Sequence, residues 1–231
     1  IPNWLEPFWY DTYLKNRAPL PVHSNVAFVL EKNKQVEHLS QSEFVASLII
    51  SLFQYQQILS NETLPIDYQG SSPLCMSQYK TILGTARVPG HERDELQTDS
   101  NTQHIVIIIN GHYYALNVFD EDDEILDYSL ILDNISWMVD NSKQKVDYAV
   151  GNLTTLNRTQ WAELRTHLSE INLTNRSAID SIETALAVIV MDQNEWVNDS
   201  EMFKSMLCGD SNNRWYDKSL QFIVNNRHIA V

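Results

Sequence analysis

The segment His104–Phe119 constrains the fold more than any other feature of this chain. It consists of two runs rich in β-branched and aromatic residues, His104–Ile109 and His112–Phe119, joined by Asn110-Gly111. Asn-Gly fits the type I′ turn, because both central residues of that turn adopt positive φ. The sequence therefore predicts a β-hairpin. We interpret the acidic run Asp120–Glu124 that follows as the solvated end of this unit, since it lacks the spacing of a calcium loop.

Helical periodicity is clearest after Ser40, a potential N-cap with Glu43 three residues on. From there apolar residues recur every three or four positions, which predicts a long amphipathic helix; they are Phe44, Leu48, Leu52, Tyr55 and Leu59. Weaker patterns predict further helices over Trp4–Leu14, Pro73–Leu83, Leu130–Asn141, Arg158–Ile171 and Asn175–Ala185.

The remaining segments are expected to be extended or irregular. Leu20–Val29 follows a proline and is predicted to be extended, and residues 87–103 are predicted to form a turn and an exposed loop. Leu186–Met191 and Leu220–Val224 are short apolar runs typical of buried strands. Strands and helices thus interleave, so the fold class is α/β (α+β), a mixed β-sheet flanked by helices, in one domain over residues 1–231 without linker or repeat.

Composition excludes several classes of function. The formal net charge of -14 argues against nucleic acid as a partner, because such binding needs clustered Lys and Arg. The apolar runs fall short of the ~20 residues of a membrane-spanning helix. Two cysteines, Cys75 and Cys208, fit a reducing, intracellular compartment and are expected to be small buried residues. Seven Asn-x-Ser/Thr sequons are interpreted as chance in a chain rich in these residues.

A search for local chemical motifs finds none of the usual ones. The six glycines give little material for a phosphate-binding loop, so no tightly bound cofactor is expected. The histidines are not at ligand spacing, so no metal site is expected. His104 and His112 are expected at strand ends and His228 in a frayed terminus. His23, after two prolines, lies either in a binding cleft or in structural packing, and is the one substrate-binding candidate.

The segment Arg214–Ser219 holds several groups that are costly to bury singly, which predicts a network of paired charges under the strand that follows.

Several blocks of the chain carry a resemblance to a known family. They occur in this order: Tyr13-Leu-x-x-Arg17, Pro21-Val-x-Ser24-Asn25, Pro73–Tyr79, Arg87-Val-Pro-Gly90 with Asp94, His104-Ile-Val, Arg158-Thr-x-Trp161-Ala and Asn213–Phe222. In these blocks, and in their order, the chain resembles the choline/carnitine acyltransferases.

The resemblance implies a CoA-dependent acyltransferase fold in which acyl-CoA, as co-substrate, and a small quaternary-ammonium alcohol meet in a tunnel. It implies a histidine as general base, which takes the proton of the attacking hydroxyl. In relatives that histidine follows the Arg-Trp-Tyr-Asp-Lys-Ser strand, so its counterpart would lie beyond Val231. Residues 1–231 would then be the N-terminal part of a catalytic body, inactive alone, with an exposed apolar face. The catalytic and cofactor-binding residues are therefore not assigned within this chain.

Two branches of the family, and a non-catalytic alternative, stay open at this point. Asn61–Pro65 and Pro73–Met76 resemble carnitine acetyltransferases, whereas Ile1–Trp4 and Leu20–Val22 resemble choline acetyltransferases. A truncated or inactive scaffold of the same family is the third reading. The chain departs from the family pattern at Cys208, where relatives commonly have His, and at His23, where they have Tyr or Asn. The compartment, whether mitochondrion, peroxisome or cytoplasm, is not resolved.

Overall fold

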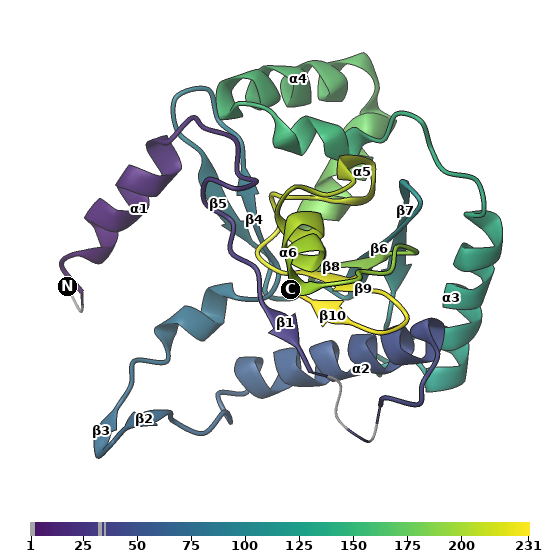
Figure 1. Ribbon diagram of the computed structural model, residues 1–231. Coiled ribbons are helices and arrows are strands. Elements are labelled where there is room, and N and C mark those ends of the chain that lie inside the picture. The colour runs from purple at the N-terminus through teal and green to yellow at the C-terminus, as the bar shows by residue number, and fades with distance from the viewer. Residues whose placement is uncertain (1–2, 32–33, 35) are drawn as a thin grey trace.

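A six-stranded mixed sheet forms the centre of the computed structural model, which describes residues 3–31, 34 and 36–231 (Figure 1). Ile1 and Pro2, part of the opening that resembles the choline branch, lie outside the described residues. The strand order is β1-β10-β9-β8-β6-β7, in which β6, β8 and β9 run parallel and the other pairs are antiparallel. The strands are β1 (Val29–Leu30), β6 (His104–Ile109), β7 (His112–Asn117), β8 (Val188–Met191), β9 (Gln221–Val224) and β10 (Ile229–Ala230).

The predicted hairpin is confirmed as β6 and β7, which pair from His104↔Asn117 to Ile109↔His112. Asn110 and Gly111 have φ of 52° and 84°, so both turn residues take the positive φ that a type I′ turn requires. The short apolar runs Leu186–Met191 and Leu220–Val224, which were predicted to be buried strands, are confirmed as β8 and β9.

Helices cover both faces of the sheet, and alternate residues of the central strands point to opposite layers. Ile105, Ile107 and Ile109 pack with α2 (Gln41–Ser60) and α3 (Tyr128–Asn141). Val106 and Ile108 pack with α4 (Arg158–Ile171), α5 (Leu173–Thr184) and α6 (Asp199–Cys208). Because both faces are covered, β6 is apolar throughout rather than alternating with polar residues.

The N-terminal helix and one arm extend away from these layers (Figure 1). Helix α1 (Glu6–Lys15) exposes Phe8, Trp9 and Tyr13, which are 66%, 58% and 45% accessible. The arm holds a small hairpin, β2 (Tyr68–Gln69) with β3 (Ser72–Pro73), and a single 3₁₀ turn, η1 (Ser77–Thr81). Both features place large apolar side chains in solvent.

Side-chain caps explain where the helices begin. Ser40 and Glu43 form the predicted capping box of α2, in which each side chain accepts from the other residue's backbone N–H. The side chains of Asn157, Asn172 and Asn198 cap α4, α5 and α6. Three of the seven sequons are thus helix starts, because an N-cap Asn is followed by Ser or Thr in the first turn.

Several expectations are wrong in detail. The helix predicted over Pro73–Leu83 is only the 3₁₀ turn η1, and residues 87–103 are not a loop throughout. They contain most of a second hairpin, β4 (Thr85–Val88) with β5 (Glu95–Thr98). Its strands are short and its turn, around Pro89-Gly90, carries no two-residue hairpin signal.

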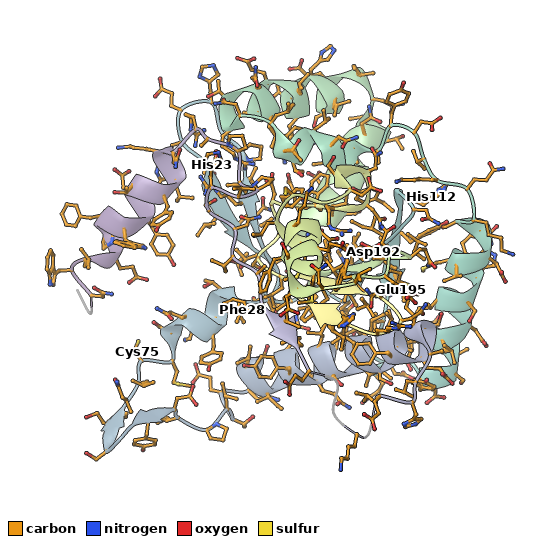
Figure 2. All side chains as sticks on the ribbon, in the orientation of Figure 1. His23, Phe28, Cys75, His112, Asp192 and Glu195 are labelled. Carbon is orange, nitrogen blue, oxygen red and sulfur yellow. The ribbon has the colours of Figure 1, made fainter. Side chains whose placement is uncertain are left out.

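Leu20–Val29 begins with a turn at residues 21–24 and becomes extended only afterwards. The C-terminal segment is not frayed, since Ile229 and Ala230 form β10 and are buried. Cys75 and Cys208 are exposed rather than buried. Cys75 lies on the arm (Figure 2), and Cys208 is the last residue of α6. Helix α6 has no counterpart among the predicted elements, although Met202, Phe203, Met206 and Leu207 recur at helical spacing.

Candidate functional site

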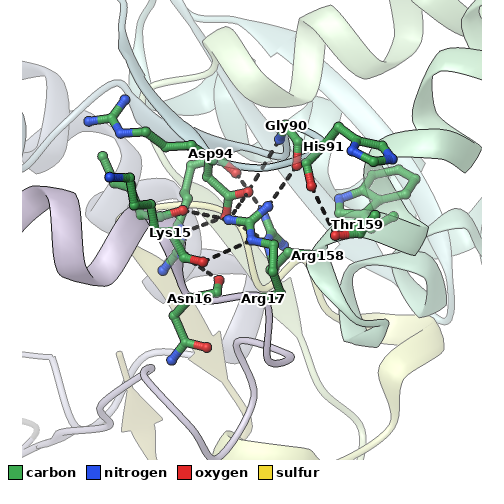
Figure 3. A network of polar contacts seen from close by, with 12 residues as sticks. Lys15, Asn16, Arg17, Gly90, His91, Asp94, Arg158 and Thr159 are labelled. Atoms are coloured by element: carbon green, nitrogen blue, oxygen red, sulfur yellow. Dashed lines mark hydrogen bonds and ion pairs between the residues drawn. The ribbon is translucent and has the colours of Figure 1, made fainter.

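A buried network of arginines and aspartates joins four distant segments of the chain (Figure 3). Its centre is Asp94, which is fully buried and accepts hydrogen bonds from Arg17, Arg87 and Arg158 at 2.9, 2.7 and 2.8 Å. Arg17 lies just after α1, Arg87 lies on β4, and Arg158 is the first residue of α4. A carboxylate removed from water is tolerated only when it is paired in this way.

Arg158 extends the network to the segment before β9. Its Nη1 donates to Asp217 at 2.6 Å, and Trp161 Nε1 donates to the same carboxylate at 2.7 Å. Burial lowers the pKa of Arg158, but the attraction of Asp217 and Asp94 outweighs it and leaves the pKa raised. Arg158 and Trp161 on α4 therefore hold the Asp217 carboxylate in place, and with it the backbone of the segment before β9.

A second buried pair holds the start of the same segment. Arg214 Nη2 donates to Asp192, which follows β8, at 2.7 Å, with both side chains essentially out of solvent. Asn213 accepts from the backbone N–H of Gly111 in the β6–β7 turn. The network of paired charges predicted for residues 214–219 is thus confirmed.

The fixed segment forms one wall of a cavity of about 310 Å³. The opposite wall is the extended stretch from Ser24 to Phe28, and the two walls are tied where Asn25 Nδ2 donates to the backbone carbonyl of Tyr216. The hairpin β4–β5 contributes Thr85, Arg87 and Leu96. The rest of the lining comes from Leu20, the end of α6, the segment before β9, Gln221 and Ile223 of β9, and Val231.

Burial perturbs three titratable groups of this wall, and it raises the pKa of Asp217 although Arg158 opposes that shift. Burial raises the pKa of Tyr216 to about 12 and lowers the pKa of Lys218 to about 7. Lys218 pairs with Ala86 across an antiparallel bridge, and its Nζ donates to the carbonyl of Glu183 at the end of α5 at 2.6 Å. Lys218 therefore caps the C-terminus of a helix, where a cation is favoured by the helix dipole.

His23, the substrate-binding candidate, lies in the turn at residues 21–24 and is exposed (Figure 2). It is adjacent in sequence to Ser24, which lines the cavity, whereas no histidine is among the described lining residues. His104 Nε2 bonds the carbonyl of Ser181 and His112 Nε2 that of Gln144, so both sit at strand ends as expected. A role of His23 in binding stays a prediction.

Two further properties concern the described residues as a whole. No group of three or more His, Cys, Asp or Glu side chains within residues 3–31, 34 and 36–231 is arranged to hold a metal ion. In the same part of the chain, every helix is too short or too polar for a bilayer crossing.

The Asp94 network was not predicted, although its members lie in the sequence blocks that resemble the acyltransferase family. Arg17, Arg87, Asp94, Arg158 and Trp161 lie as many as 144 residues apart along the chain. The available signal was that four separate blocks each carry at least one arginine or aspartate beside apolar residues. Only the folded structure shows which of these charges pair, because their spacing along the sequence does not specify which of them come into contact.

Comparison with known proteins identifies what these blocks belong to. The model of the family "Choline/Carnitine o-acyltransferase" matches residues 2–230. Carnitine O-acetyltransferase from Columba livia is 33% identical over 237 residues, and that from Homo sapiens 32%; each match covers 96% of this chain and 38% of the relative. Choline O-acetyltransferase from Gallus gallus is 33% identical over 241 residues, covering 96% of this chain and 37% of the relative. The chain thus spans well under half the length of these relatives.

Proposed function

Because this chain belongs to the choline/carnitine O-acyltransferase family, we propose that it is the N-terminal part of an enzyme that transfers a short acyl group between acyl-CoA and carnitine. The observation that carries the proposal is the convergence of the family-like blocks on one buried network. Four of them contribute Arg17, Arg87, Asp94, Arg158 and Asp217, which hold the cavity wall in place. The network is the scaffold of the site and does not itself perform the reaction.

The reaction needs a base, and no histidine stands among the described residues that line this cavity. A hydroxyl attacks a thioester only if a group within hydrogen-bond reach, about 2.6–3.2 Å, takes its proton. The lining residues offer Lys218, which caps α5, and Asp217, whose carboxylate is bound by Arg158 and Trp161. We therefore propose that a histidine beyond Val231 in a longer parent chain supplies the base, with CoA thioester as co-substrate rather than a resident cofactor.

Choline is the alternative acceptor, because the chain is equally identical to a choline and a carnitine acetyltransferase, at 33% each. The two alcohols differ in a carboxylate that only carnitine carries. A site with a buried cation placed for that carboxylate would bind choline poorly, since the cation would be left unpaired.

The exposed aromatic side chains of α1 support the proposal that further chain packs on this domain. Phe8 and Trp9 lie on one short helix that contacts the rest of the fold mainly through Leu14 and the loop after it. We propose that the remainder of a parent chain covers this face.

The test is an assay of free CoA thiol with acetyl-CoA and either L-carnitine or choline, against a blank without alcohol. This chain is expected to release no thiol above the blank, and a chain continued past Val231 is expected to release it, with the preferred alcohol identifying the branch. Release by this chain alone would contradict the placement of the base, and a His23→Ala variant would then be assayed. No release by a folded, continued chain would overturn the acyltransferase proposal and favour the non-catalytic scaffold.

A further inference from the structure

Arg87 is the one guanidinium of the Asp94 network that also lines the cavity. Its Nε donates to Asp94 at 2.7 Å, and its Nη2 donates to the carbonyls of Tyr13 and Asn16 at 2.8 and 3.4 Å. No acceptor for Nη1 occurs among the residues that the structure describes. Two N–H donors of Arg87 are therefore without a partner among these residues, and they remain open to solvent because Nη1 is not a buried atom.

The charges of the network do not balance. It contains the three guanidiniums of Arg17, Arg87 and Arg158 and the two carboxylates of Asp94 and Asp217, which leaves one positive charge in excess. The pKa directions point to Arg87 as the undercompensated member: burial lowers the pKa of Arg87 despite Asp94, whereas two carboxylates raise that of Arg158. Because the free donors of Arg87 are open to solvent, an anion that enters the cavity can accept hydrogen bonds from them.

The side chains around Arg87 define what kind of anion would fit. Leu96 stands directly opposite Arg87 in the β4–β5 ladder, and both line the cavity. Most of the other nearby wall is apolar, from Leu20, Val26, Phe28, Leu207 and Ile223. The other charged lining residues are occupied, since Asp217 is bound by Arg158 and Lys218 by the carbonyl of Glu183.

We propose that this cavity binds the carboxylate of a small organic acid, which accepts hydrogen bonds from Arg87 Nη1 and lays its apolar body along the aliphatic and aromatic wall. A monoanion matches the single excess charge, whereas a phosphate dianion would overcompensate it. The planar guanidinium suits a carboxylate, and a cavity of about 310 Å³ is at the lower end of the size of small-molecule sites. The proposal rests on this geometry and not on the acyltransferase activity.

The test uses Leu96 rather than Arg87, because a substitution of Arg87 would also break its bond to Asp94. A residue opposite Arg87 in the ladder has its Cβ about 5 Å from that of Arg87, so a Glu there would reach the guanidinium. Leu96→Glu would place a carboxylate of the protein itself in the site. Leu96→Gln is the matched neutral variant, and Arg227→Met removes an exposed arginine, paired with Glu195, as a charge control.

Calorimetric titration with sodium hexanoate, hexanamide and inorganic phosphate then decides the matter. We expect hexanoate to bind the unmodified chain and Arg227→Met with similar affinity, and to bind Leu96→Gln more weakly but measurably, because the amide replaces part of the apolar wall. Hexanamide and phosphate are expected to bind the unmodified chain at least about tenfold more weakly than hexanoate. Leu96→Glu is expected to lose hexanoate binding and to raise the melting temperature. Equal binding of acid and amide, equal or tighter binding of phosphate, undiminished binding to Leu96→Glu, or no binding of hexanoate to the unmodified chain would each overturn the proposal.

Discussion

Arg158 and Asp217 form a salt bridge of 2.6 Å, in which the side chains retain only 0% and 2% of their solvent exposure. The pair connects the first turn of α4 to the segment before β9, 59 residues later in the chain. Since Arg158 also binds Asp94, one side chain donates hydrogen bonds to two buried carboxylates. The contact therefore decides whether the cavity wall is held in place.

Arg158→Met is expected to destabilise the fold severely. It leaves both carboxylates buried without their shared partner, which typically costs about 3–5 kcal/mol. Urea unfolding followed by circular dichroism measures the loss. Arg176→Met removes an exposed arginine from the Arg176–Asp180 pair on α5 and should leave the midpoint nearly unchanged. Similar midpoints for the two variants would contradict the role assigned to Arg158.

Lys218→Met is expected to change the pH dependence of stability. The pKa of Lys218 is about 7 in the fold against 10.5 in an unfolded chain, so folding disfavours its charged form. That penalty is fully present below about pH 7 and is relieved as the pH rises toward 10.5. The stability of the unmodified chain relative to Lys218→Met should therefore increase with pH.

Urea unfolding of both chains between about pH 7 and about pH 9.5 measures this difference, with about 1.4 kcal/mol expected per unit by which the pKa is displaced, as an upper bound. The lost bond to Glu183 adds an offset that does not depend on pH. Stability curves that run parallel over the whole range would show that Lys218 is not perturbed.

Asn157→Ala and Asn198→Ala are expected to cost about 1 kcal/mol each, because each removes the N-cap of a helix. Asn134 offers a matched control: it too heads a sequon, but it lies within α3, exposed, with its amide on the carbonyl of Leu130. Asn134→Ala should leave stability unchanged or raise it slightly, since Ala is the better helix former. Equal losses at all three positions in urea unfolding would argue against capping.

Gly111→Ala is expected to destabilise the β6–β7 turn by about 1–3 kcal/mol, because φ is 84° and an added Cβ would lie 3.1 Å from Cβ of Val146. Gly70→Ala is the control, since φ there is 64° but no atom lies within 4 Å of the added Cβ. Gly70→Ala therefore introduces the backbone strain of a positive φ but no steric contact. Gly70 lies on the arm that projects from the fold. Thermal unfolding should separate the two, and a greater loss at Gly70 would contradict the packing argument.

Local sequence patterns determined much of this fold. The Asn110-Gly111 turn, the capping box at Ser40 and the apolar strand runs depend on residues a few positions apart, so propensity and periodicity predict them. The resemblance of ordered sequence blocks also predicted the family. The hairpin of β4 and β5 was not predicted, because its strands, Thr-Ala-Arg-Val and Glu-Leu-Gln-Thr, are not apolar runs and its turn is irregular.

Only the tertiary structure decided which charges meet and where the cavity lies. Arg17, Arg87 and Arg158 each stand in a separate block, and no local rule indicates that all three converge on Asp94. The free Nη1 of Arg87 is likewise invisible in the sequence, since it depends on which acceptors the fold brings within reach. Electrostatic pairing in a buried site follows from distances through space, whereas a sequence fixes only distances along the chain.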